Sequence, residues 1–176
     1  YKHTDGNIKW RQEQLETRVG EVSKALTLLE RLNAGCIQLA RGVDFSGKLQ
    51  LADATSSGHS FGALTAIKAG DADTRFVRTL TFDPWLFALA DDPASLTFTR
   101  TPLCVINSNQ WNPSWRTPTP GRNDDRMGTL CELRREAGSP TFYAEVTGTR
   151  HMSASDVPHL LGGIMRLFTW FRRQVV

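Results

Sequence analysis

The sequence predicts an α/β fold in which about four parallel strands are flanked by helices. Strand-like and helix-like segments alternate along the chain, which is the order that a parallel sheet requires. The apolar run at 102–107 is typical of a strand buried on both faces. A Gly-x-Ser-x-Gly pentapeptide at 58–62 stands where a strand would turn into a helix. With 176 residues, 40% of them apolar, we expect one domain over residues 1–176.

An amphipathic helix is expected over residues 11–32, after a polar lead-in. Five apolar residues recur there at spacings of four and three, namely Leu15, Val19, Val22, Leu26 and Leu29. Gly35 is placed to end the helix. The stripe predicts a packing face, and a partner-binding face is the less favoured alternative.

The middle of the chain predicts a strand, a sharp turn, a helix and a second strand. Residues 52–57 are the first strand candidate and lead into the pentapeptide. Small residues at 63–69 favour a helix that stops at Gly70. Residues 75–82 are β-prone and end at Asp83.

The last third of the chain continues the alternation. After the strand at 102–107, residues 108–128 predict a long surface loop, because they are rich in Asn, Pro, Arg and Gly. Residues 141–146 predict a further strand that leads to His151.

A final helix is expected from Ser153 onward. Ser153 and Asp156 have the spacing of a capping box, and Arg172 and Arg173 suit a helix C-terminus. Its apolar face comprises Leu160, Leu161, Ile164, Leu167, Phe168 and Phe171.

Composition and charge exclude several classes of protein. The formal net charge is +3 and the basic residues are scattered, so no nucleic-acid partner is expected. No apolar run reaches the roughly 18 residues that would span a bilayer. The three cysteines, Cys36, Cys104 and Cys131, are odd in number and lack metal-ligand spacing. Free thiols and an intracellular or organellar setting are therefore favoured.

Ser60 is the predicted nucleophile. A serine on a tight strand-to-helix turn has strained backbone angles, and we expect Gly58 and Gly62 to avoid collisions there. Its hydroxyl would lie above the sheet at a helix N-terminus, whose amides favour developing negative charge. The alternative is a glycine-rich turn in which Ser60 is merely solvated.

A serine hydroxyl needs a base, and the base needs an orienting carboxylate. Asp83 follows the first strand after the pentapeptide and His151 follows the third, so both are expected at the carboxyl edge of the sheet. Asp156 fits better as a helix cap. His59 neighbours Ser60 but should point away from it. The alternative interpretation of His151 is a polar loop residue.

Four ordered motifs carry a more specific pattern. They are Gly-His-Ser-Phe-Gly at 58–62, Phe-Asp-Pro-Trp-Leu-Phe at 82–87, Pro-Leu-Cys-Val-Ile-Asn-Ser at 102–108 and Gly-Thr-Arg-His-x-Ser-x-Ser-Asp at 148–156. Together they resemble the platelet-activating factor acetylhydrolases, the plasma and intracellular type II family of lipoprotein-associated phospholipases. The 23-residue interval from Ser60 to Asp83 is similar as well.

The resemblance implies an α/β hydrolase with serine esterase activity. Its substrates would be phospholipids with short or oxidised sn-2 acyl chains, and it would need neither calcium nor another metal or cofactor. Ser60 would be the nucleophile, Asp83 the orienting acid and His151 the base.

The same resemblance assigns three further residues. Phe61 would supply one backbone amide of the oxyanion hole. Trp85 and Phe87 would lie near the acyl group of the substrate, and core packing under the loop is an equal alternative for both.

The resemblance also implies strands before the pentapeptide, with the second oxyanion donor among them. A parallel piece of about four strands would leave a long unpaired edge. We therefore expect this chain to be the C-terminal catalytic half of an α/β-hydrolase domain, completed by an N-terminal segment or a partner chain.

Two other functions stay open. One is an esterase for soluble acyl esters. The other is a hydrolase-derived structural or accessory subunit of a larger assembly with little turnover, which the polar strand at 52–57 favours and the complete Ser, Asp, His order opposes. Aromatic and basic residues at 170–173 suit contact with a lipid surface, although a solvated basic helix end is the favoured interpretation.

Overall fold

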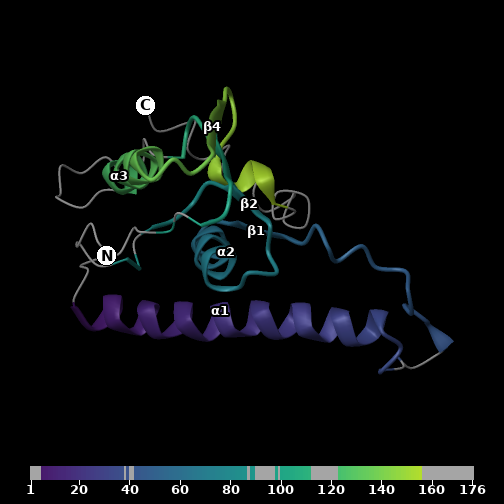
Figure 1. The fold of residues 1–176 in the computed structure, drawn as a ribbon. Coiled ribbons are helices and arrows are strands. Elements are labelled where there is room, and N and C mark those ends of the chain that lie inside the picture. Colours follow the sequence, from purple (N-terminus) through teal and green to yellow (C-terminus); the bar gives the residue numbers. More distant parts are fainter. Residues whose placement is uncertain are drawn as a thin grey trace, which may run out of the picture.

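The computed structural model describes residues 5–37, 39, 42–86, 88–89, 98, 100–111 and 123–155. Figure 1 shows a long helix beneath a sheet that carries two further helices. In chain order the elements are α1 (Asp5–Asn33), β1 (Thr55–His59), α2 (Phe61–Ala72), β2 (Arg78–Phe82), β3 (Leu103–Ser108), α3 (Asn123–Glu136), β4 (Thr141–Val146) and the short 3-10 helix η4 (His151–Ala154).

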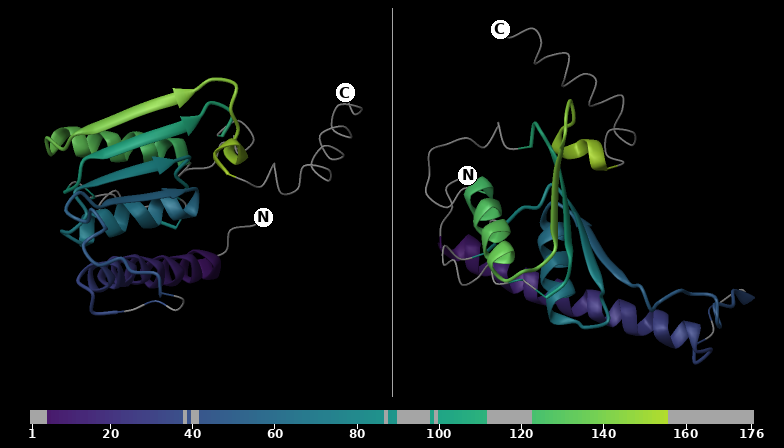
Figure 2. Two further views of the ribbon diagram at one scale, coloured as in Figure 1. Left: turned by 90° about the vertical axis from the view of Figure 1, so that its right-hand side faces the viewer. Right: turned by 45° about the horizontal axis from the view of Figure 1, so that its top comes forward.

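The four strands form one parallel sheet in the order β1-β2-β3-β4. All of them therefore end at the same edge, as the arrows in Figure 2 show. The predicted α/β class, with parallel strands flanked by helices, is confirmed. The first strand lies later than predicted, because it begins at Thr55 and includes Gly58 and His59.

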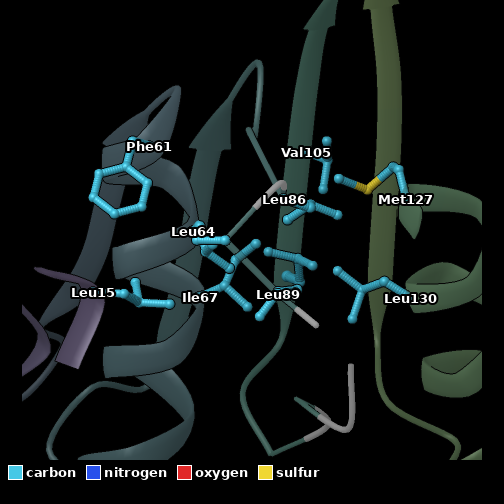
Figure 3. Close-up of a cluster of buried hydrophobic side chains, with 11 residues drawn as sticks. Leu15, Phe61, Leu64, Ile67, Leu86, Leu89, Val105, Met127 and Leu130 are labelled. Atoms are coloured by element: carbon cyan, nitrogen blue, oxygen red, sulfur yellow. The ribbon is translucent and has the colours of Figure 1, made fainter. Parts of the chain in front are cut away.

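The main hydrophobic core lies between the sheet and helices α2 and α3. Leu64 in α2, Val105 in β3 and Leu130 in α3 are completely buried in one cluster (Figure 3). Leu15 adds α1 to the same cluster. Full burial of each such side chain stabilises the fold by about 1.5–3 kcal/mol. The cluster thereby fixes α2 and the turn from which it starts.

Helix α1 is longer than predicted, and its apolar stripe is buried over only part of its length. The helix begins at Asp5, within the expected lead-in. Leu15 and Leu26 are 2% and 5% exposed, whereas Leu29 is 41% exposed. The C-terminal end of α1 extends past the sheet in Figure 1. Leu32, nearer that end, is 6% exposed, so Leu29 lies on an uncovered side of the helix. Gly35 follows the helix with a φ of 72°, as predicted for a helix end.

Gly70 does not end the second helix, since α2 continues to Ala72. A Cβ at Gly70 would overlap the hydroxyl of Thr79 and would lie 2.8 Å from Ser56 Oγ. The glycine therefore permits close approach of helix and sheet. The two hydroxyls beneath it hydrogen-bond to each other at 2.8 Å, which explains how the polar residue Ser56 is tolerated at 3% exposure in β1.

The predicted surface loop at 108–128 is wrong over its last residues, which form the start of α3. Helix α3 buries Met127, Leu130 and Arg134 on one face. The guanidinium of Arg134 donates to the carbonyl oxygens of Thr101 and Pro140, so a charged residue occupies an inward position. The loop was expected because residues 108–128 are rich in Asn, Pro, Arg and Gly. Arg126, within that range, is nevertheless buried and donates to the carbonyl oxygen of Leu86 at 3.1 Å.

The expected final helix lies outside the described residues, as do Asp156 and the aromatic and basic residues at 170–173. At its predicted start, Ser153 belongs to η4 and its hydroxyl accepts a hydrogen bond from the amide of Arg150 at 3.0 Å. Among the described helices, none has both the length and the apolar character needed to cross a bilayer.

Candidate active site

The predicted catalytic residues lie at the carboxyl edge of the sheet. Ser60 directly follows β1, Asp83 directly follows β2, and His151 comes five residues after β4. Because parallel strands all end at this edge, side chains far apart in sequence meet there.

Ser60 occupies a strained turn between β1 and α2. Its backbone angles are φ 59° and ψ −123°, a conformation that non-glycine residues rarely adopt. A Cβ at Gly58 would overlap the backbone of Gly62, so the turn requires glycine at the first position. A Cβ at Gly62 would meet no described atom within 4 Å, so the expected steric need for glycine there is wrong.

The structure brings Ser60, His151 and Asp83 together in one hydrogen-bonded series. Ser60 Oγ lies 2.9 Å from His151 Nε2, and Asp83 Oδ2 lies 3.2 Å from His151 Nδ1. An ionised carboxylate only accepts hydrogen bonds, so Nδ1 carries the ring proton and Nε2 is left to accept from the serine hydroxyl. This is the arrangement in which an imidazole can take a proton from a serine.

Asp83 is held as a carboxylate by its surroundings. Its side chain is buried, and burial alone would raise its pKa. Hydrogen bonds from His151 and from the amide and hydroxyl of Ser108 outweigh burial and lower the pKa of Asp83 below 3.8. The backbone of Asp83 also has a positive φ of 46°, in the left-handed region that non-glycine residues seldom adopt.

Two aromatic rings contact His151, and neither was assigned a role from its sequence position. The indole of Trp111 stacks on the imidazole with ring centroids 3.4 Å apart and an angle of 14° between the planes. His59 lies with its ring centroid 4.4 Å from that of His151, and its Nε2 donates to the carbonyl oxygen of His151 at 2.7 Å. His59 thus contacts His151 directly. The sequence predicted only that the ring of His59 would point away from Ser60, and this contact was not predicted.

Ser108 is the third residue that sequence reasoning left without a role. It ends β3, between the strands that precede Asp83 and His151, and that position was the available signal. A residue at the carboxyl end of the intervening strand must lie near both neighbours in a parallel sheet. Trp111 follows the same strand, but an irregular turn intervenes, so its ring direction had no periodicity from which to be predicted.

A model of the family described as platelet-activating factor acetylhydrolase, isoform II, matches residues 1–173. The chain belongs to this family. The resemblance of the four sequence motifs is therefore confirmed.

Several solved structures are similar to parts of this acetylhydrolase-family chain. One is a protein of unknown function from Agrobacterium tumefaciens, provisionally classed as an α/β hydrolase, with 15% identity over 70% of this chain and a TM-score of 0.45. Another is an uncharacterised protein from Bacillus cereus, with 15% identity over 92% and a TM-score of 0.45. A third is the siderophore hydrolase EstA from Aspergillus nidulans, with 21% identity over 64% and a TM-score of 0.35. The matches cover 53%, 44% and 47% of those chains, so this chain spans about half of their length.

In this family member, an aromatic pair lies beside the nucleophile turn. Phe61 is the first residue of α2, where a backbone N–H has no partner within the helix. Its ring meets that of Trp85 edge to face, with centroids 5.8 Å apart. Trp85 also packs against the main core, so the packing alternative describes its observed contacts. Phe87 lies outside the described residues.

Two arginines of α1 approach the same aromatic pair. The guanidinium carbons of Arg11 and Arg18 lie 5.6 and 5.1 Å from the centroid of the Phe61 ring, and Arg11 lies 5.5 Å from that of Trp85. These distances are within the range of cation–π attraction. The first helix therefore contributes positive charge beside the nucleophile turn.

The site also meets a simple distance criterion for metal ligands. His59, Asp83 and His151 offer ligand atoms that all lie within 4.8 Å of one another. The hydrogen bond between Asp83 and His151 accounts for one of these approaches. That the reaction needs no metal remains a prediction.

Proposed function

We propose that this chain carries the catalytic residues of a serine carboxylester hydrolase. Ser60 is the nucleophile, His151 the general base and Asp83 the acid that orients the base. The observation that carries the proposal is the hydrogen-bonded series between them, with separations of 2.9 and 3.2 Å. Membership of an acetylhydrolase family supports an ester as the substrate.

In the first half of the reaction, Ser60 Oγ bonds to the ester carbonyl carbon while its proton moves to His151 Nε2. The carboxylate of Asp83 stabilises the imidazolium that forms. His151 then gives the proton to the oxygen of the leaving alcohol as the ester C–O bond breaks. An acyl group remains on Ser60.

In the second half, water attacks the acyl carbon and passes a proton to His151. The proton then returns to Ser60 Oγ as the carboxylic acid leaves. The N–H of Phe61 is proposed to provide one donor to the oxyanion, and the second donor is proposed to come from a completing N-terminal segment or a partner chain. Loss of a single such donor costs on the order of 100- to 1000-fold in rate. No step uses a metal, so a chelator should leave the rate unchanged.

The substrates that we infer are phospholipids with short or oxidised sn-2 acyl chains, because the family is named for the cleavage of an acetyl ester. Trp85 and Phe87 are proposed to border the acyl group. An esterase for soluble acyl esters is the alternative within the same chemistry, and an accessory subunit with little turnover is the alternative outside it.

Fluorophosphonate labelling tests the proposed nucleophile. The full-length protein should be labelled at Ser60, and Ser60→Ala should abolish labelling. Ser57→Ala is the matched control, because Ser57 lies in β1 and is exposed, and it should label as the parent does. A folded parent that does not react, or a Ser60→Ala variant that still reacts, would overturn the proposal.

A substrate series tests the proposed class. Phospholipids with an sn-2 acetyl group or a short oxidised chain should have higher kcat/KM than long-chain phospholipids and p-nitrophenyl esters. A preference for the p-nitrophenyl esters would favour the soluble-ester alternative. Labelling without measurable turnover of either class would favour the accessory subunit.

A further inference from the structure

The turn that follows β3 places Trp111 against His151. The indole is 7% exposed and lies almost parallel to the imidazole, with 3.4 Å between the ring centroids. The amide of Trp111 donates to the carbonyl oxygen of Ser108 at 3.0 Å, which closes the turn. Trp111 is thus held by the same residue that hydrogen-bonds to Asp83.

The turn that carries Trp111 is joined directly to the segment that carries His151. The amide of Gln110 donates to the carbonyl oxygen of Thr149 at 3.2 Å, and the side chain of Arg150 donates to that of Gln110 at 2.9 Å. The amide of Gly148 donates to the side chain of Asn109 at 3.0 Å. These three bonds fix one segment against the other, so the stack does not depend on the two rings alone.

The stack uses the face of the imidazole, while the two hydrogen bonds of the ring use its edge. Nδ1 points to Asp83 and Nε2 to Ser60, both within hydrogen-bonding distance. A flat neighbour at 3.4 Å stops the ring from tilting out of the plane in which both bonds form. Trp111 therefore restricts a motion that neither hydrogen bond restricts by itself.

The face-to-face geometry has a further electrostatic consequence. Two neutral aromatic rings prefer offset or edge-to-face contacts, because their negative faces repel each other. A cation is attracted to an aromatic face, and indole is the strongest of the natural rings in this respect. The observed stack thus becomes more favourable when His151 gains the proton from Ser60.

We propose that Trp111 is a positioning residue that aligns His151 and stabilises its imidazolium form during acyl transfer. The inference rests on the proposed serine-hydrolase reaction. An interaction that strengthens as charge develops lowers the barrier, because only such differential binding accelerates the chemical step. Trp111 acts through His151 and is not required to touch the substrate.

The test compares Trp111→Leu and Trp111→Phe with the parent in the full-length protein. Leucine fills part of the space without an aromatic face, whereas phenylalanine keeps a weaker one. The kcat for p-nitrophenyl acetate and the rate of fluorophosphonate labelling should both fall roughly ten- to thirtyfold in Trp111→Leu. They should fall less in Trp111→Phe. KM should change little, because the small ester does not need the indole for binding.

The pH profile of kcat/KM separates charge stabilisation from a general structural role. Without the stack the protonated imidazole is less favoured, so the acidic limb of the profile should move to lower pH in Trp111→Leu. A smaller movement in the same direction is expected for Trp111→Phe, which keeps the proposal testable if the leucine variant does not fold.

Three results would overturn the inference. They are an unchanged labelling rate with only KM altered, an equal loss in both variants with an unchanged pH profile, and a movement of the acidic limb to higher pH. Failure of the proposed function is recognised separately, because the parent itself would then not be labelled at Ser60.

Discussion

The amide of Trp85 donates a hydrogen bond of 3.1 Å to the carbonyl oxygen of Ser60. The amide of Ser60 donates in turn to the carbonyl oxygen of Phe82 at 3.0 Å. The backbone of Ser60 is therefore hydrogen-bonded to a residue before Asp83 and to a residue after it. Among the described non-glycine residues, Ser60 and Asp83 alone have positive φ, at 59° and 46°. The two strained turns therefore hold each other in place, which is how such conformations persist in a folded protein.

Gly58 is the glycine on which the geometry of Ser60 depends. In Gly58→Ala the new Cβ would overlap the backbone of Gly62, and backbone cannot move aside as a flexible side chain can. The free energy of unfolding should fall by about 1–3 kcal/mol or more, and fluorophosphonate labelling should fall with it.

Gly62→Ala is the matched control for this change, because a Cβ there meets no described atom within 4 Å. Its stability should stay within about 1 kcal/mol of the parent, with any gain due to the better helix propensity of alanine. Chemical denaturation measures both variants. If both variants lost the same free energy of unfolding, the overlap at Gly58 would add no cost of its own, which would contradict the prediction.

Ser108 should influence stability through the ionisation of Asp83. A carboxyl group whose pKa is lowered in the fold contributes stability that is fully present above its unfolded value of 3.8 and is lost as pH falls through the folded value. Ser108→Ala removes the side-chain bond of 2.7 Å while keeping the backbone amide. It should therefore be less stable than the parent at neutral pH, and the difference should shrink as pH falls below 3.8.

Denaturant titrations at a series of pH values measure that difference. Ser57→Ala is the control, because Ser57 is exposed and lies opposite Leu80, three residues before Asp83. Ser57→Ala should show a pH-independent difference from the parent. A pH-independent difference for Ser108→Ala as well would contradict the assigned role.

The sequence was sufficient to predict the three residues of the hydrogen-bonded series, because each follows a strand of a parallel sheet. The edge of the sheet then brings Ser60, Asp83 and His151 together whatever the details of the loops. The contacts made by Trp111 depend on an irregular turn, and those of His59 on the direction of a strand's last side chain. Alternation along β1 predicts on which side the His59 ring lies, but its contact with His151 depends on the segment after β4, which, like the turn that carries Trp111, has no period that sequence reasoning can use.

The error at α3 has a different cause. An arginine-containing segment was expected at the surface, but Arg126 is 8% exposed and donates to the carbonyl oxygen of Leu86. Arg134 of the same helix is 1% exposed, because backbone carbonyl groups accept its donors. The error at Gly70 is similar, since a glycine in a helix pattern was interpreted as an end when it permits close packing on Thr79. In both cases tertiary contacts reverse the usual meaning of a residue type.

His59 should make the stability depend on pH near neutrality. Burial lowers the pKa of His59 from 6.5, and the nearby charge of His151 lowers it further, while Asp83 opposes both. The unfolded chain therefore takes up a proton at a higher pH than the fold does, and stability falls as pH decreases below 6.5.

His59→Gln tests this dependence, because glutamine keeps an N–H donor that can reach the carbonyl oxygen of His151 but does not titrate. The free energy of unfolding of the parent, relative to that of His59→Gln, should decrease between pH 7.5 and pH 5. The kcat of His59→Gln at pH 8 should exceed that of His59→Ala, which loses the donor. A constant difference across the pH range would show that His59 does not titrate differently in the fold.

Gly70 and Gly20 offer a paired test of why glycine occurs within a helix. Both lie inside helices, but a Cβ at Gly70 would overlap the hydroxyl of Thr79, whereas a Cβ at Gly20 meets no described atom within 4 Å. Gly70→Ala should destabilise the protein by about 1–3 kcal/mol, because α2 must move away from the sheet. Gly20→Ala should stabilise it by about 0.5–1 kcal/mol through helix propensity alone.

The double variant Gly70→Ala with Thr79→Ala decides whether the overlap is the cause. Removing the hydroxyl makes room for the new methyl group but leaves Ser56 Oγ, buried at 3% exposure, without its 2.8 Å partner. The two substitutions should therefore be coupled, with the double variant less destabilised than the sum of the single ones. Denaturant titration measures the free energy of unfolding of each variant. If the losses are additive, the contact between α2 and β2 is not the reason that Gly70→Ala is destabilising.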